Sequence, residues 1–269
     1  MDILGRPHDQ LRLRDSNIGS IELRPGGVGR NVAERVRRLG ADCTLLTVFG
    51  NDALADALRG SCSGMDIDIS HALTVTGRTS VYLAVHDETG DMLTAVNDMA
   101  IAASLTPAYA RECLPVIDTA DICVLDANPP AETLRLIAEQ AKAPLLMDPV
   151  SCAKIERVRP LLPFLAAIKP NILEAQSLTG CNDARDCAAK LVQLGVKRVF
   201  VSLGEEGLCC ADARMCTVLP VQKLSCSPKT GAGDALCAGL AVALAKGMDT
   251  LESAQFGMQC AADYLNEEK

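Results

Sequence analysis

The chain has 269 residues, of which 49% are hydrophobic and only 3% aromatic, so a large core is available and must be built from aliphatic side chains. The net charge is −8 and no apolar run is long enough to span a bilayer, which argues against binding nucleic acid or membranes. The 13 cysteines lie mostly in apolar runs without a C-x-x-C pair, which indicates reduced thiols in a cytoplasmic protein.

A glycine turn leads into a predicted helix near the start of the chain. Residues 25–33 read Pro-Gly-Gly-Val-Gly-Arg-Asn-Val-Ala, and the apolar spacing over 33–39 before Gly40 is typical of an amphipathic helix that ends at a glycine. Asn31 falls in the first turns of this helix, from which its side chain can reach back to the loop. A tight turn that binds nothing is the simpler alternative.

Apolar runs that alternate with helical patterns predict a parallel sheet with helices on both faces. The expected strands are 43–48, 121–125, 144–148, 166–169 and 199–203. The expected helices begin at 52 and 129 and span 184–194 and 252–264. Polar residues such as Asp126, Asp148 and Ser202 follow these strands, at the edge of such a sheet where ligands usually bind.

A different pattern appears between residues 79 and 96, where two apolar runs flank the polar turn 87–91. This pattern predicts a β-hairpin, and we expect residues 11–23 to add a neighbouring strand. We therefore expect one domain over 1–269, with lid strands at about 11–24 and 78–97. A lid of this kind would cover a substrate or form a dimer interface.

A second glycine turn, Thr230-Gly231-Ala232-Gly233-Asp234, opens a helix that continues with the apolar run 235–240. Backbone N–H groups at a helix start lack partners and carry partial positive charge, and glycine lets a phosphate come close to them. An acid in the same turn can take a proton from an attacking hydroxyl, so the motif suggests phosphoryl transfer. A helix cap alone is the simpler alternative, which a second such turn in the same chain makes less attractive.

Over nearly its whole length the chain resembles the ribokinase-like (PfkB) sugar and nucleoside kinases. The resemblance rests on the early glycine helix, the lid hairpin, Asn171 with Glu174, residues 202–207 and the Thr-Gly-Ala-Gly-Asp motif. Within the family, residues 15–19, 25–31, 90–99 and 148–151 resemble pseudouridine kinases. The resemblance implies a three-layer α/β/α sandwich with a mostly parallel central sheet and a small β lid.

The resemblance implies ATP-dependent phosphorylation of the 5′-hydroxyl of pseudouridine. Asp234 would be the general base, and the amides of Gly231, Ala232 and Gly233 would stabilise charge on the phosphoryl oxygens. Two alternatives stay open. One is a kinase of the same family for ribose, fructose or another nucleoside, and the other is a nucleoside-binding protein without turnover.

The family pattern also implies the residues of each binding site. Those implied for the substrate are Asp2, Gly26, Gly27, Asn31, Asn97 and Asp98. Those implied for ATP are Asn171, Ser202, Gly204, Gly207, Lys229 and Thr230, with Glu174 acting on Mg²⁺ through water. Simpler readings are a frayed terminus for Asp2, a surface turn for Asn97 and Asp98, and an exposed carboxylate for Glu174.

The sequence departs from the family pattern in three places. The glycine-rich strand that normally precedes the aspartate matched to Asp2 is absent, so we expect an incomplete floor to the site. Pro228 stands where the family often has Asp or Asn near a monovalent-cation site, which argues against K⁺ activation. The chain stops at Lys269, earlier than many members. The expected partners are a small nucleoside or sugar and ATP, and the family also allows a homodimer through the lid.

Overall fold

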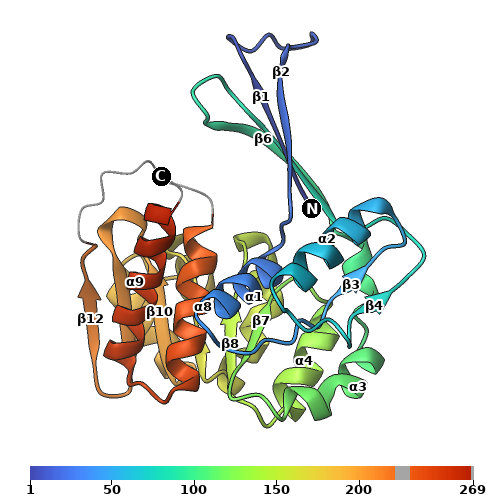
Figure 1. Ribbon diagram of the computed structural model, residues 1–269. Helices are drawn as coiled ribbons and strands as arrows, with labels where there is room; N and C mark the ends of the chain where they lie inside the picture. The colour runs from blue at the N-terminus through green and yellow to red at the C-terminus, as the bar shows by residue number, and fades with distance from the viewer. Residues whose placement is uncertain (222–230, 268–269) are drawn as a thin grey trace.

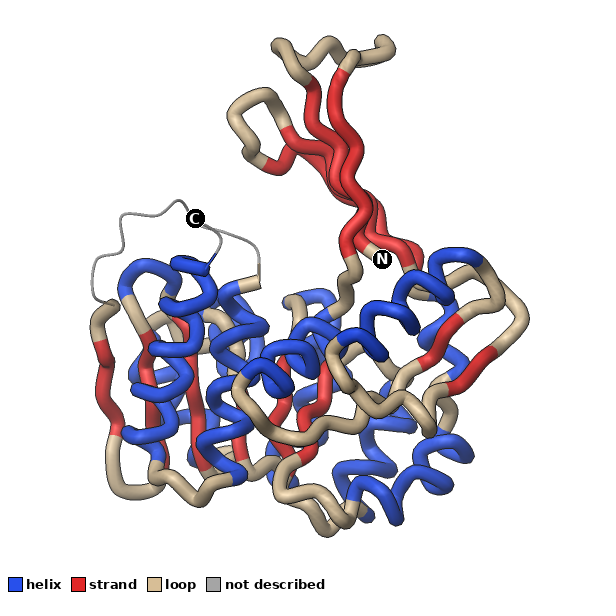
Figure 2. The backbone as a smooth tube through the Cα atoms, viewed as in Figure 1, coloured by secondary structure: helices blue, strands red, loops and turns tan. Residues whose placement is uncertain are grey.

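The computed structural model describes residues 1–221 and 231–267 of the chain. It has a central sheet between two layers of helices, and a second sheet that stands away from them (Figures 1 and 2). Within the described residues, no helix is both long enough and apolar enough to cross a membrane. The cysteines in the same residues are all free thiols, and half of them are buried.

The central sheet has the strand order β12-β11-β10-β9-β8-β7. Its parallel strands are β7 (Cys123–Asp126), β8 (Leu145–Asp148), β9 (Ala167–Ile168) and β10 (Arg198–Ser202), and β11 (Leu208–Asp212) and β12 (Cys216–Leu219) extend one edge as antiparallel strands. The mostly parallel sheet and four of the five strands predicted for it are confirmed. Each of these parallel strands ends at the same edge, where the predicted polar residues follow.

Helices cover both faces of this sheet. One layer holds α1 (Val28–Arg38), α8 (Ala232–Ala245) and α9 (Thr250–Glu267), and the other holds α3 (Pro107–Ile117), α4 (Ala131–Gln140), α5 (Ile155–Val158), α6 (Ile172–Thr179) and α7 (Ala184–Gln193). Short 3₁₀ helices lie at η1 (Ala100–Ser104), η2 (Cys152–Lys154), η3 (Arg159–Phe164) and η4 (Gly204–Glu206).

The alternation of side chains along a strand explains why these strands read as continuous apolar runs. Leu145 and Met147 pack with the layer that contains α3 to α7, whereas Leu146 between them packs with the layer of α1, α8 and α9. Phe200 likewise points to the side opposite Val199 and Val201. Both faces are therefore buried in helices, as expected for a parallel sheet.

The lid is a four-stranded sheet with the order β2-β1-β5-β6. Its strands are β1 (Asp2–Pro7), β2 (Gly19–Arg24), β5 (Val81–His86) and β6 (Met92–Asp98). The predicted hairpin corresponds to β5 and β6, and the predicted neighbouring strand corresponds to β2, although residues 11–18 form a loop. Sequence analysis missed β1, which pairs with β2 on one side and with the distant β5 on the other.

The strand predicted at 43–48 is wrong in extent and in place. Only Val48–Phe49 form β3, which pairs with β4 (Leu73–Thr74) in a separate two-stranded sheet after α2 (Ala53–Gly64). Thr44 makes an isolated bridge to Asp68. The run 43–48 does not belong to the central sheet because, within the described residues, it has a hydrogen-bonded neighbour along one edge only.

A groove of about 830 Å³ separates this segment from β7, the last strand of the central sheet. Apolar side chains line it, among them Leu45, Leu46, Tyr109 and Val124. Because β8 occupies one edge of β7 and no described strand occupies the other, the backbone of β7 faces this groove. The groove continues to Asp126, Gly29 and Asp2. The region around these three residues is therefore open toward the free edge of β7.

Candidate active site

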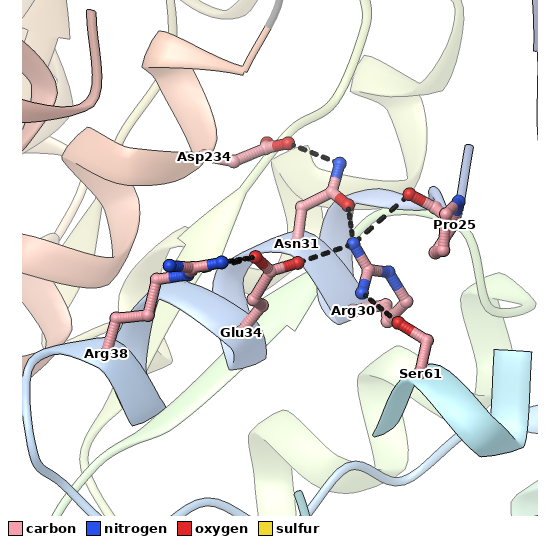
Figure 3. A network of polar contacts seen from close by, with 7 residues as sticks. All are labelled: Pro25, Arg30, Asn31, Glu34, Arg38, Ser61 and Asp234. Atoms are coloured by element: carbon pink, nitrogen blue, oxygen red, sulfur yellow. Dashed lines mark hydrogen bonds and ion pairs between the residues drawn. The ribbon is translucent and has the colours of Figure 1, made fainter. Parts of the chain in front are cut away.

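The two glycine turns identified in the sequence lie close together in the fold. The first turn leads into α1 and the second into α8, and these two helices pack against each other (Figure 1). Asn31 of α1 donates a hydrogen bond of 2.9 Å from its amide Nδ2 to Oδ2 of Asp234 in α8 (Figure 3). The fold thus joins the candidate base directly to a candidate substrate-binding residue.

The start of α8 leaves backbone amides available to an anion. Gly231 precedes the helix with φ 107°, a conformation that favours glycine, and no side chain caps the helix there. The N–H groups of Ala232 and Gly233 therefore lack the partners that later helical residues have. A β-carbon at Gly231 would lie only 2.6 Å from the hydroxyl of Tyr264, so a larger residue at this position would have to displace that side chain.

Asp234 is partly buried in the first turn of α8, and this burial raises its pKa to about 6. The hydrogen bond from Asn31 and the ammonium of Lys169 act in the opposite direction, while the carboxylates of Asp148 and Asp2 raise the pKa further. A carboxylate with a pKa near neutrality is a stronger base than an ordinary aspartate and is still ionised at pH 7.

Asp2 packs tightly against the first glycine turn. A β-carbon at Gly26 would lie 2.2 Å from the carboxyl atoms of Asp2, and Gly27 has φ 101°. Met1 is buried, and Asp2 of β1 pairs with Arg24 of β2 and with Tyr82 of β5, so this end of the chain is not frayed. Burial raises the pKa of Asp2, and the N-terminal ammonium and Arg30 counteract part of that effect.

The two candidate residues at the end of β6 lie on opposite faces of the lid. Asn97 pairs with Tyr82, which pairs with Asp2, so these three residues share one face of the sheet. Asp98 belongs to the other face, and its Oδ1 accepts a hydrogen bond of 3.3 Å from the N–H of Ala100. The structure therefore brings Asn97 to the side of Asp2 and uses Asp98 to start η1.

Asn171 and Glu174 form a capping box at the start of α6. Oδ1 of Asn171 accepts from the N–H of Glu174, and Oε2 of Glu174 accepts from the N–H of Asn171, each at 2.9 Å. Asn171 also forms a β-bridge with Ser202 at the end of β10. These candidate ATP residues therefore follow neighbouring parallel strands at the carboxyl edge of the sheet.

Gly204 is the first residue of η4 and Gly207 directly follows it, shortly after β10, with φ 61° and 114°. A β-carbon at Gly207 would lie 2.0 Å from the carbonyl oxygen of Leu219 on β12, so close packing by itself requires this glycine. The remaining ATP candidates, Lys229 and Thr230, lie outside the described residues, as does Pro228 at the position compared with a cation site.

Glu174 is the candidate outer ligand for a divalent cation. It is buried, and burial raises its pKa, as does the nearby Asp148, whereas the N–H of Asn171 and the ammonium of Lys169 lower it. Among the described residues, no group of three or more His, Cys, Asp or Glu side chains is placed to hold a metal ion. A lone carboxylate fits Mg²⁺ that keeps water and phosphate oxygens as its other ligands.

Sequence analysis assigned no role to two cations at this site. Lys169 follows β9 and makes a 3.0 Å ion pair with Asp148 of β8, and both side chains are more than nine-tenths buried. Its ammonium would lie 3.7 Å from a β-carbon at Gly233. A lysine directly after a buried strand was the available signal. The second cation is Arg30, which contacts the amide of Asn31 (Figure 3).

Comparison with known proteins agrees with this arrangement. The model of the pfkB family of carbohydrate kinases matches residues 4–266. The chain is 36% identical to the pseudouridine kinase of Escherichia coli K12, over 99% of this chain and 88% of that protein. It is 26% identical to the guanosine-inosine kinase of Exiguobacterium acetylicum, over 98% and 91% of the two chains.

The solved structures lead to the same family. The ribokinase of Thermotoga maritima superimposes with a TM-score of 0.89 at 25% identity, covering 98% of this chain and 89% of that one. This superposition confirms the ribokinase-like α/β fold that the sequence predicted for this chain. With a family match over nearly all residues and a full-length relative above 30% identity, the chain belongs to the pfkB family of carbohydrate kinases.

Proposed function

We propose that this ATP-dependent kinase phosphorylates the 5′-hydroxyl of pseudouridine. The observation that supports the chemistry most strongly is the contact between Asn31 and Asp234 at the uncapped start of α8. The substrate assignment is supported by the 36% identity to a protein named pseudouridine kinase. The relatives named for guanosine, inosine or ribose are less similar, at 24–26% identity.

In the proposed reaction, Asp234 accepts the proton of the 5′-hydroxyl as the oxygen attacks the γ-phosphorus of ATP. The new O–P bond forms while the bond to the β,γ-bridging oxygen breaks, and ADP leaves. The amides of Gly231, Ala232 and Gly233 stabilise charge on the transferred phosphoryl oxygens. Mg²⁺ held near Glu174 through water would offset the charge of the ATP phosphates.

The substrate would bind between the lid and the first glycine turn. Asp2 can accept hydrogen bonds from two ribose hydroxyls, and the close approach of Gly26 to Asp2 keeps that carboxylate beside the turn. Gly27 and Asn31 would complete the ribose site, and Asn97 shares the lid face of Asp2 and would contact the base. We retain Asp98 as a candidate that would act by holding the end of β6.

The nucleotide would bind at the carboxyl edge of the central sheet, beyond β9 and β10. Asn171 and Ser202 are joined there by a backbone bridge, and Gly204 and Gly207 form the turn that follows. Lys229 and Thr230 are proposed for the phosphate side on the family pattern alone. Bound in this way, ATP would have its phosphates next to the start of α8.

A substrate panel tests the proposed function. The protein is incubated with ATP and Mg²⁺ together with pseudouridine, uridine, inosine, ribose or fructose, and ADP formation and thermal stabilisation are measured for each. We expect ADP and pseudouridine 5′-phosphate, with the highest kcat/KM for pseudouridine. A higher kcat/KM for free ribose would overturn the nucleoside assignment, and stabilisation by a nucleoside without ADP would indicate binding without turnover.

The pH dependence of the reaction tests the assignment of the base. Only ionised Asp234 can accept a proton, and its raised pKa moves the loss of activity to a higher pH than an ordinary aspartate would give. We expect kcat/KM to be level above about pH 7 and to fall about tenfold per pH unit below about pH 6. A profile that stays level down to about pH 4.5 would mean that Asp234 is not the base.

We also propose that two copies associate through the outer face of the lid. The strand register places Ile21, Leu23, Leu83 and Val96 on the face opposite Asp2, and they are 41–74% exposed. An apolar sheet face of this kind is typical of an interface between proteins. A second copy would cover this face without blocking the side that carries Asp2.

The oligomeric state is measured by analytical ultracentrifugation. We expect the wild-type protein to be a dimer and Leu23→Lys to be a monomer, because the lysine ammonium would be buried in the apolar contact. Ser20→Lys introduces the same side chain on the other face of β2 and should leave the dimer intact. A wild-type monomer at micromolar concentration would rule out this interface.

A further inference from the structure

Arg30 is a buried cation one residue away from Asn31, and its side chain links three parts of the site. Nη2 donates hydrogen bonds to Oδ1 of Asn31 at 2.9 Å, Oε2 of Glu34 at 2.8 Å and the carbonyl oxygen of Pro25 at 3.1 Å, and Nη1 donates to Oγ of Ser61 at 3.1 Å (Figure 3). The side chain is only 10% exposed. One guanidinium therefore connects α1, the first glycine turn and α2.

The contact with Arg30 determines which way the amide of Asn31 points. A guanidinium has donors only, so the atom of Asn31 that faces it has to be the oxygen. The NH₂ group then faces Asp234, where it donates the 2.9 Å hydrogen bond. Rotating the amide by half a turn would set NH₂ against the guanidinium and oxygen against an ionised carboxylate, and both contacts would be repulsive.

Glu34 keeps Arg30 in place. Its Oε2 accepts from Arg30, while its Oε1 accepts from Arg38 at 3.0–3.1 Å (Figure 3). Burial acts to raise the pKa of Glu34, but the hydrogen bonds and charges of the neighbouring arginines outweigh it, and the pKa is lowered. An ionised Glu34 thus completes a continuous sequence of contacts from Arg38 through Arg30 and Asn31 to Asp234.

We propose that Arg30 is a positioning residue, which holds the amide of Asn31 as a hydrogen-bond donor to Asp234 and ties the first glycine turn to α1 at Pro25. The role of Arg30 in catalysis rests on the proposed function, whereas the contacts of Arg30 do not depend on it. Arg30 does not touch Asp234, so its effect on that carboxylate passes through Asn31. Without Arg30 the amide is free to rotate and to accept a hydrogen bond from the protonated acid.

Other charged groups also act on Asp234 and have to be separated from Arg30. Lys169 and Asp148 face it from the ends of β9 and β8, Asp2 faces it from β1, and the thiol of Cys237 lies on its own helix. Arg30 also acts on the charge of Asp2. Arg30→Lys keeps the positive charge but cannot form all four contacts at once. This variant therefore shows whether Arg30 affects Asp234 by orienting the amide of Asn31 or by its charge.

The test compares Arg30→Gln and Arg30→Lys with Arg38→Gln. Arg38 lies on the same helix and bonds the same Glu34, but it is half exposed and does not reach Asn31, which makes it a matched control. Loss of a hydrogen bond to a charged group is expected to raise the pKa of Asp234 by about one unit in Arg30→Gln, and by less in Arg30→Lys. Arg38→Gln should leave it unchanged.

Two measurements report this shift. Titration of the Asp234 carboxyl carbon by NMR in the substrate-free protein needs no turnover, so it decides the role of Arg30 even if no compound in the substrate panel is phosphorylated. With an active substrate, kcat/KM of Arg30→Gln should fall about fivefold at pH 6 and hardly at all at pH 8, while KM for ATP stays unchanged. Thermal unfolding identifies folded variants, and Arg30→Lys carries the test if Arg30→Gln does not fold.

A double-mutant cycle shows whether the effect passes through Asn31. Because Arg30 acts on Asp234 only by way of that amide, Arg30→Gln added to Asn31→Ala should cause no further shift in the titration of Asp234. An unchanged titration in a folded Arg30 variant would overturn the proposal. Fully additive shifts in the double variant would also overturn it, because Arg30 would then act through its charge alone.

Discussion

Asp234→Asn is expected to lower kcat by about 10²–10⁴-fold while leaving the affinity for ATP nearly unchanged. Asparagine keeps the shape of the side chain but cannot take the proton of the acceptor hydroxyl. The amides of Gly231 and Gly233 and the residues after β9 and β10 stay in place. Steady-state kinetics with the best substrate of the panel gives kcat, and calorimetric titration gives ATP affinity.

The same variant should be more stable than the wild type near neutral pH, which distinguishes lost chemistry from lost folding. Since the folded-state pKa of Asp234 is raised, its contribution to stability is lost as pH rises from about 4 to about 6. Removing the charge should therefore increase the free energy of unfolding at pH 7 by about 1–3 kcal/mol. Asp263→Asn, at an exposed position of α9, is the control; unchanged kcat in Asp234→Asn would refute the base assignment.

Lys169→Met is expected to reduce the free energy of unfolding by about 3–5 kcal/mol, because it leaves the carboxylate of Asp148 buried without its partner. Burial alone would lower the pKa of Lys169, but Asp148 and the other acids around it hold that pKa above its usual value. The lysine is therefore fully charged at neutral pH. Urea unfolding at pH 7 measures the loss.

Two comparisons make this prediction specific. Lys142→Met removes a lysine whose side chain is 85% exposed and 3.9 Å from Asp118, so it should cost less than about 1 kcal/mol. The double variant Asp148→Asn/Lys169→Met removes both charges and should recover part of the stability. A cost for Lys169→Met as small as that for Lys142→Met would mean that the buried pair contributes little.

Sequence patterns were sufficient where the structural requirement is local. The strands β7 to β10 are short apolar runs bounded by polar residues, and both of their faces meet helices, so their composition alone identifies them. The helix after Asp52 was predicted at its observed start, where the Asp52 carboxylate accepts a hydrogen bond from the N–H of Ala55.

Patterns failed where pairing joins distant segments. β1 carries no regular alternation, and it becomes a strand because it pairs with β5 about 80 positions later. The run at 43–48 has the composition of a core strand. One of its edges pairs with the segment that contains Asp68, through the bridge from Thr44, and its other edge faces the groove beside β7. No local signal reports the absence of a neighbouring strand.

In the candidate site, too, local features could be predicted from the sequence and contacts between distant segments could not. The glycine turns were recognisable because Gly27 and Gly231 need positive φ, which only a few residue types adopt readily. The contact from Asn31 to Asp234 spans 203 positions, and the roles of Arg30 and Lys169 follow from what they touch. An arginine on an amphipathic helix and a lysine after a strand are too common to be singled out without those contacts.

The most direct test of the account is a crystal structure with pseudouridine, ADP, Mg²⁺ and aluminium fluoride, which mimics the transferred phosphoryl group. We predict that the fluoride complex contacts the amides of Ala232 and Gly233 and that the 5′-hydroxyl lies about 2.6–3.2 Å from the Asp234 carboxylate. A phosphoryl mimic bound away from the start of α8, or an acceptor hydroxyl beyond hydrogen-bond reach of Asp234, would contradict the proposed mechanism.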